Sequence, residues 1–212
     1  CSCTPSNDNH DDKKPLTGIH PISIFGINDF HGAINENYKE AGIANIGTFI
    51  KQKTSQPNTL FIDQGDTWQG SFESNYNHGQ IVQDVFAYAN MNLRTLGNHD
   101  FDWNLDVLKE IQSRKYNGYS IPTLASNVYD FDWDTKQKGT TQQSELGQEY
   151  ATFTVENGLK IGFVGVIDES CITSIATQLV KSISFSNSTE KAKEIQREDR
   201  TPPSKKERGE AR

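Results

Sequence analysis

The chain has 212 residues, of which 33% are hydrophobic and 16 are glycine, so it is long enough for one domain with its own core. A formal net charge of −7 argues against a general attraction to nucleic-acid phosphates, and we expect no nucleic-acid partner. The three cysteines form neither a metal-knuckle spacing nor a disulfide framework, and no run of 18 apolar residues predicts a membrane-spanning helix.

The first 18 residues are polar and begin with a cysteine. The opening Cys-Ser-Cys-Thr-Pro-Ser-Asn resembles the start of a mature bacterial lipoprotein, in which the first cysteine carries lipid and a flexible tether follows. We therefore expect a tether over residues 1–18, with lipid on Cys1 as the sole link to a membrane. This places the protein at the cell envelope or on the extracellular surface. An arbitrary start of the sequence is the alternative interpretation.

Strand-like and helix-like segments alternate through the middle of the chain. Helical spacing of apolar residues predicts helices over 42–53, 79–89 and 104–113, with Asn104 as an N-cap. The segment 130–148 has no clear period and is predicted to be a long surface loop. Strands are predicted over 19–27, 59–62, 93–96, 121–125, 150–156 and 160–167, the last two joined by an Asn-Gly hairpin signal at 157–158. This order predicts an α/β fold with a mixed sheet.

Acidic, amide and histidine side chains follow three of the predicted strands. They are Asp29 and His31 after the first strand, Asp66 after the second, and Asn98, His99 and Asp102 after the third. Because the carboxyl ends of strands meet at one edge of a sheet, we expect these side chains to surround one site. Carboxylate and imidazole together suit a pair of divalent transition metals (Zn, Mn, Co or Fe), which two-metal hydrolytic sites hold close together.

The three loops carry motifs that resemble a known family. The motifs are Asn-Asp-Phe-His-Gly at 28–32, Gly-Asp-Thr-Trp-Gln-Gly-Ser at 65–71 and Gly-Asn-His-Asp-Phe-Asp at 97–102. Their order and spacing resemble the bacterial 5′-nucleotidase / 2′,3′-cyclic phosphodiesterase family, and later matches at 125–128 and 162–166 extend the likeness over about residues 19–195. The resemblance implies a calcineurin-like metallophosphoesterase fold, an αββα sandwich of mixed sheets, in its N-terminal catalytic domain.

The resemblance also implies a role for each site residue. Asp29 and His31 would bind the first metal, Asp66 would bridge both, and Asn98 would bind the second. His99 would stabilise charge on the phosphoryl oxygens or leaving group, and Asp102 would orient its ring. Asn127 would line the site near the phosphate. The implied reaction is hydrolysis of nucleotide phosphoesters by a metal-bound water.

The sequence departs from the family pattern after the third loop. The family takes further histidines from later loops, but the five histidines here, at 10, 20, 31, 78 and 99, include none beyond His99. We therefore expect the second metal to bind weakly and hydrolysis by this chain to be slow.

The end of the chain also departs from the pattern. Residues 188–198 still resemble the family's next helix, whereas 199–212 are basic and lack apolar residues that could begin a strand. We expect a partial metallophosphoesterase domain over 19–198, incomplete at its C-terminal end, and a disordered tail over 199–212 from a truncated or frame-shifted reading. A natural short variant is the alternative.

Two functions remain open from the sequence. One is a nucleotide phosphoesterase with an incomplete catalytic domain. The other is a non-catalytic surface lipoprotein or binding module that retains the fold, favoured by the missing histidines. The intact spacing of Asn98, His99 and Asp102 favours an enzyme. The sequence makes no prediction about the oligomeric state.

Overall fold

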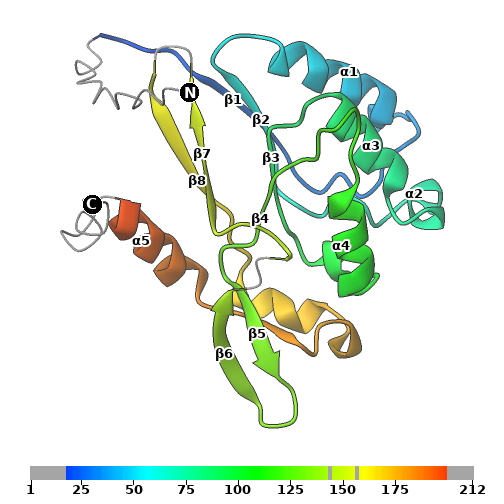
Figure 1. Cartoon of the computed structure of the whole chain (residues 1–212). Coiled ribbons are helices and arrows are strands. Elements are labelled where there is room, and N and C mark those ends of the chain that lie inside the picture. The colour runs from blue at the N-terminus through cyan, green and yellow to red at the C-terminus, as the bar shows by residue number, and fades with distance from the viewer. Residues whose placement is uncertain (1–17, 143–144, 156–157, 200–212) are drawn as a thin grey trace, which may run out of the picture.

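In the computed structural model, the described residues are 18–142, 145–155 and 158–199. The lipid predicted on Cys1 and nearly all of the predicted tether and tail lie outside these ranges. The predicted alternation of strands and helices is confirmed (Figure 1). No helix in the described ranges is long and apolar enough to cross a membrane.

A parallel sheet forms the centre of the molecule. Its strands pair in the order β1 (Ser23–Ile27), β2 (Thr59–Asp63), β3 (Leu93–Thr95) and β4 (Thr123–Leu124). Four of the five residues of β2 are buried, as expected of an interior strand in a parallel sheet. Because all four strands run the same way, the loops that follow them open at the same edge.

Helices connect these strands and lie together on one side of the sheet (Figure 1). They are α1 (Gly42–Thr54), α2 (Phe72–Tyr76), α3 (Gln80–Tyr88) and α4 (Leu105–Ser113). The core beneath them contains the fully buried side chains of Ile50, Trp68, Phe86 and Phe101. Asn104 caps α4 as predicted, since its side-chain oxygen accepts hydrogen bonds from the amides of Asp106 and Val107.

The prediction of a surface loop over 130–148 is wrong for residues 130–142. Strands β5 (Val128–Asp132) and β6 (Gln137–Gln142) form a hairpin there, and β9 (Ile183–Phe185) pairs with the other edge of β5. The sequence of β6 is polar on both faces, so it lacks the alternation that predicts a strand. Its turn is held by the Asp132 carboxylate, which accepts hydrogen bonds from the amides of Asp134 and Thr135.

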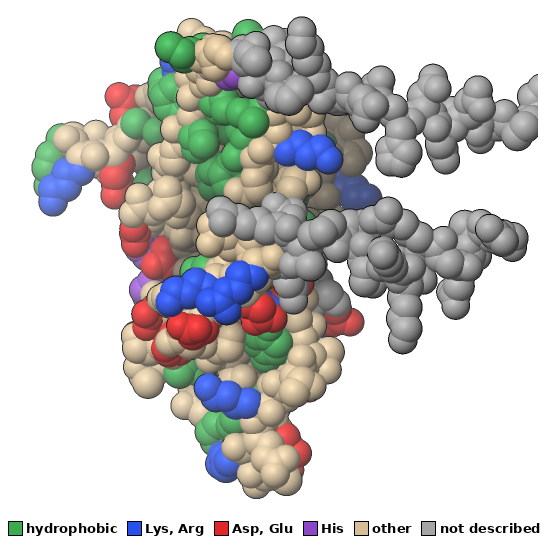
Figure 2. Space-filling view, turned by 90° about the vertical axis from the view of Figure 1, so that its left-hand side faces the viewer, with side chains coloured by type: hydrophobic (Ala, Val, Ile, Leu, Met, Phe, Trp, Pro, Cys, Tyr) green, Lys and Arg blue, Asp and Glu red, His purple; other side chains and the backbone are tan. Residues whose placement is uncertain are grey.

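A second hairpin, formed by β7 (Tyr150–Thr154) and β8 (Lys160–Val164), confirms the Asn-Gly signal and faces the opposite side of the parallel sheet from the helices (Figure 1). No residue of these two strands, all of which are described, is buried. Ile24, Tyr150 and Val164 are exposed. The surface on this side shows hydrophobic side chains above a band of basic and acidic side chains (Figure 2).

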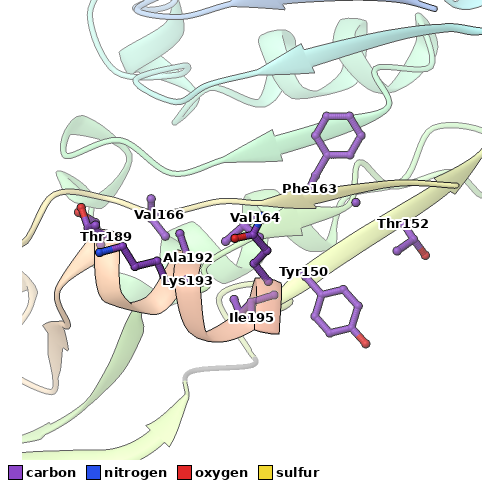
Figure 3. A pocket seen from close by; sticks show the side chains of 12 residues that line it. Tyr150, Thr152, Phe163, Val164, Val166, Thr189, Ala192, Lys193 and Ile195 are labelled. Atoms are coloured by element: carbon purple, nitrogen blue, oxygen red, sulfur yellow. The ribbon is translucent and has the colours of Figure 1, made fainter. Parts of the chain in front are cut away.

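A cavity of about 720 Å³ separates the hairpin from helix α5 (Ser188–Asp199). Tyr150 and Thr152 line it from β7, Val164 and Val166 line it from β8 and the residues after it, and Ala192 lies across from them on α5 (Figure 3). The architecture is therefore that of layered α/β sheets in which the layer formed by β7 and β8 is narrow.

Candidate metal centre

The loops after β1 and β2 adopt a strained backbone and are hydrogen-bonded to each other. Asp29, His31 and Asp66 have φ values of 51°, 48° and 54°, in the left-handed region that costs a non-glycine residue roughly 1–3 kcal/mol. The amide of Asp29 donates to Gly65 O at 3.1 Å, and that of His31 donates to Asp66 O at 2.9 Å. The second loop thus fixes the conformation of the first.

Three side chains from these loops converge. Ligand atoms of Asp29, His31 and Asp66 all lie within 4.8 Å of one another, and they are the group that could hold a metal ion in the described part of the chain. Nε2 of His31 lies 3.8 Å from Oδ1 of Asp29. Two carboxylates and an imidazole suit a divalent transition metal, so these residues fit the ion that the sequence predicts.

His31 is held with the correct nitrogen facing the cluster. Its Nδ1 lies 3.0 Å from the carbonyl oxygen of Gln69, to which an Nδ1–H donates. The lone pair is then on Nε2, the atom near Asp29. A second hydrogen bond of this kind is the usual way in which a protein sets the tautomer of a metal-binding histidine.

The third loop meets Asp66 directly. The amide of His99 donates to Oδ1 of Asp66 at 2.8 Å. A Cβ atom on Gly97 would lie 2.2 Å from the same oxygen, so this approach requires glycine. Asn98 lies between Gly97 and His99, at the start of the short helix η1 (His99–Phe101), and is half-buried. The structure therefore brings Asn98 to the loop that contacts Asp66, and its role as a ligand stays a prediction.

His99 and Asp102 form a pair. Nδ1 of His99 lies 2.8 Å from Oδ2 of Asp102, and the His99 ring lies 5.2 Å from that of His31, centroid to centroid. The hydrogen bond that the His99 ring donates to Asp102 is the main cause of a raised pKa for His99. The nearby charges of Asp102, Asp66 and Asp100 also raise this pKa, while burial opposes them. The ring is thus more readily protonated than that of an ordinary histidine.

Asp100 is a site residue that the sequence interpretation gave no role. Its buried carboxylate accepts hydrogen bonds from the amides of Asp66 (3.0 Å), Thr67 (2.9 Å) and Gly97 (2.9 Å). Burial raises the pKa of Asp100 to about 7, although the bonds from Gly97 and Thr67 lower it. The position of Asp100 in the Gly-Asn-His-Asp motif at 97–100 is the sequence feature that could have indicated its role in holding the loops.

Asn127 lies apart from this cluster in its contacts. It is fully buried, and its Nδ2 donates to the carbonyl oxygens of Ile167 and Ser186, both at 2.7 Å. Its Oδ1 accepts from the amide of Ile167 at 3.0 Å. These bonds join the end of β8 to the end of β9, and the predicted contact with phosphate stays a prediction.

A small cavity adjoins the metal cluster. Its volume is about 220 Å³, and Asn28, Asp29, His31 and Glu40 are among its lining residues. The wider cavity between the hairpin and α5 is lined by none of the predicted site residues (Figure 3). We place the candidate site at the converging ligand atoms, and two of the three residues that supply them, Asp29 and His31, line the smaller cavity.

Comparisons with known proteins show which chains this one is similar to. No family model matches the chain. A 5′-nucleotidase of Vibrio parahaemolyticus is 27% identical over 202 residues, which cover 92% of this chain and 32% of that protein. A cell wall protein of Listeria monocytogenes is 25% identical over 193 residues, covering 80% of this chain and 24% of the relative.

A solved structure shows the fold. The calcineurin-like phosphoesterase YfkN from Bacillus subtilis superposes with a TM-score of 0.65 and 22% identity, over 84% of this chain and 57% of that one. The chain spans about a third or less of the two curated relatives named above. The chain therefore has the fold of a calcineurin-like phosphoesterase, and its sequence is similar to 5′-nucleotidases over only part of their length.

Proposed function

We propose that this chain is the metal-binding part of a hydrolase that cleaves phosphoesters of nucleotides. The observation that carries the proposal is the joint position of the metal cluster and the His99–Asp102 pair, with the rings of His31 and His99 5.2 Å apart. A cation-binding group beside an imidazole with a raised pKa is suited to a dianionic phosphoryl group.

The proposed ligands are Asp29 and His31 for one divalent ion, Asp66 for both and Asn98 for the second. Bound ions would stabilise negative charge on the phosphoryl group and on the attacking oxygen. The protein's own contribution is to orient these groups. The Gln69 carbonyl presents Nε2 of His31, and the amide of His99 holds one oxygen of Asp66.

His99 is the proposed proton donor and charge stabiliser. Asp102 occupies Nδ1, so Nε2 is the nitrogen that remains to donate to a phosphoryl oxygen or to the leaving group. The raised pKa of His99 keeps this proton in place at higher pH than an ordinary histidine would. General-acid assistance of this kind contributes about 10²–10⁴-fold in rate.

We further propose that the second ion binds weakly. Among the residues that the structure describes, only Asp66 and the neutral amide of Asn98 are assigned to it. This supports slow hydrolysis by the chain. It also favours the alternative function, a non-catalytic binding module at the cell surface that retains the fold.

A location at the cell envelope is proposed together with this function. The Listeria relative is a cell wall protein, which supports a place outside the cytoplasm.

Phosphate release from AMP in the presence of Mn²⁺ tests the enzyme proposal. We expect His99→Ala to lower the rate about 10²-fold and Asp29→Asn to abolish it. His78→Ala is the matched control, because His78 is exposed and its ring contacts Trp103 rather than the cluster. Equal rates for wild type and His99→Ala would refute the role of His99. Binding of a non-hydrolysable AMP analogue without any turnover would favour the binding module.

A further inference from the structure

A buried ion pair lies beneath the loop that carries Asp66. Arg94 lies on β3, and Asp63 lies at the end of β2. Nε of Arg94 donates to Oδ2 of Asp63 at 2.7 Å, and both side chains are 0% exposed. Burying two charges is costly unless each makes further hydrogen bonds. The remaining partners of the pair therefore indicate what it holds in place.

Asp63 holds the loop on both sides of Asp66. Its Oδ1 accepts from the amide of Gly65 at 3.2 Å, one residue before Asp66. Its Oδ2 accepts from Oγ1 of Thr67 at 2.6 Å, one residue after. A single carboxylate thus contacts both neighbours of the residue that is central to the metal cluster.

Arg94 extends the contact to a helix and to an aromatic ring. Its Nη1 donates to Oε1 of Gln83 on α3 at 2.5 Å. Its guanidinium carbon lies 4.4 Å from the centre of the Trp68 ring, which belongs to the same loop as Asp66 and is fully buried. Arg94 therefore joins β3, α3 and the loop into one packed unit.

The loop that carries Asp66 needs this support because its backbone adopts an unfavourable conformation. Asp66 has φ +54° and Gly65 has φ +100°, so two successive residues adopt the left-handed region. Such a conformation persists only where surrounding contacts over-determine it. Asp100 supplies part of this support through the amides of Asp66 and Thr67, and the ion pair contacts the loop from beneath.

We propose that Asp63 and Arg94 are positioning residues that hold the Asp66 carboxylate where the metal cluster requires it. The inference rests on the proposed function only for the assignment of Asp66 as a metal ligand. The geometry of the loop itself does not depend on that assignment, so the two claims can fail separately.

Hydrogen exchange on the full chain without metal tests the positioning directly. In Arg94→Met, we expect amides in segments 64–68 and 96–100 to exchange at least about tenfold faster than in wild type, while those of α4 do not change. Arg114→Met is the matched control. Arg114 makes two hydrogen bonds with Asp84, at 3.0 and 2.7 Å, but that pair is only half-buried and joins α4 to α3. Unchanged exchange in both segments, or equal acceleration everywhere, would overturn the proposal.

Cobalt binding, followed by its visible absorption, supplies a second readout on folded protein. We expect Arg94→Met to weaken the tighter Co²⁺ site at least about tenfold, as loss of a group that orients a ligand does. Arg94→Lys should restore part of the affinity, and Arg114→Met should leave it unchanged. Thr67→Val removes only the bond to Asp63, so it tests the same loop if Arg94→Met does not fold.

The outcomes separate the two claims. Wild-type Co²⁺ affinity in folded Arg94→Met and Thr67→Val would overturn the positioning role and leave the metal centre standing. No Co²⁺ binding by wild type would refute the proposed metal centre, and the exchange data would still decide whether the ion pair positions the loop.

Discussion

The imidazole rings of His31 and His99 lie 5.2 Å apart, although they come from loops that follow different strands of the parallel sheet. This contact places the metal cluster and the His99–Asp102 pair in one site. Hydrogen bonds fix each ring from behind, through Gln69 for His31 and through Asp102 for His99. Both rings therefore present Nε2 as the nitrogen available for function.

Removing the Asp102 charge should lower the pKa of His99. We expect the Asp102→Asn variant to show this in a histidine titration by NMR, because the hydrogen bond that His99 donates to Asp102 is the main cause of the raised pKa. Asp106→Asn, an exposed acid on the next helix, should leave the pKa unchanged.

The same pair gives a pH dependence of stability. The folded pKa of His99 is raised, so its stabilising effect is complete below the ordinary value of about 6.5 and is lost as pH rises through the folded pKa. Urea denaturation should therefore separate wild type from Asp102→Asn more at about pH 5.5 than at about pH 8.5. A difference that grows with pH would contradict this assignment.

Asp66 should dominate metal affinity. For wild type, isothermal titration with Mn²⁺ should give one tighter and one much weaker site. Asp66→Asn should weaken the tighter site more than about 10²-fold, since even indirect partners of a ligand contribute 10–100-fold. Asp134→Asn, in the exposed turn between β5 and β6, is the control. Two tight sites in wild type would show that the ligand set is larger than proposed.

Gly97 should tolerate no side chain. In Gly97→Ala, the new Cβ would lie 2.2 Å from Oδ1 of Asp66, so either the carboxylate or the loop must move. We expect a loss of about 1–3 kcal/mol in unfolding free energy, as for other overpacked sites, together with weaker Co²⁺ binding. Gly162→Ala on β8 is the control, because a Cβ there meets nothing within 4 Å. Normal Co²⁺ affinity in Gly97→Ala would show that the carboxylate can shift without consequence.

A substitution of Asn127 can decide whether this residue stabilises the fold or binds the substrate phosphate. Asn127→Ala leaves the backbone partners at Ile167 and Ser186 unpaired, so we expect a loss of about 3 kcal/mol in urea denaturation. Asn45→Ala, an exposed site on α1, should change stability little. If Asn127→Ala were as stable as wild type but raised KM for AMP, the predicted contact with phosphate would be supported instead.

The sequence predicted that three candidate ligands would converge, because they lie on loops after strands. Asp29, His31 and Asp66 could be placed together, since strand ends in a parallel sheet share an edge. Asp63, Arg94 and Asp100 were missed as parts of the site. A charged side chain in a strand or turn gives no sign that it is buried, and its partners lie on other strands. Likewise, β6 was missed because both of its faces are polar.

The β7–β8 hairpin bears on how the chain unfolds. An isolated two-stranded hairpin is marginally stable in water, and this one is joined to the parallel sheet mainly through its base, where Ser126 and Gly165 exchange hydrogen bonds. We expect it to melt before the parallel sheet and its helices, so the calorimetric enthalpy should exceed the van't Hoff enthalpy. Heating would then convert the chain first into a species whose metal loops are intact but whose hairpin is frayed.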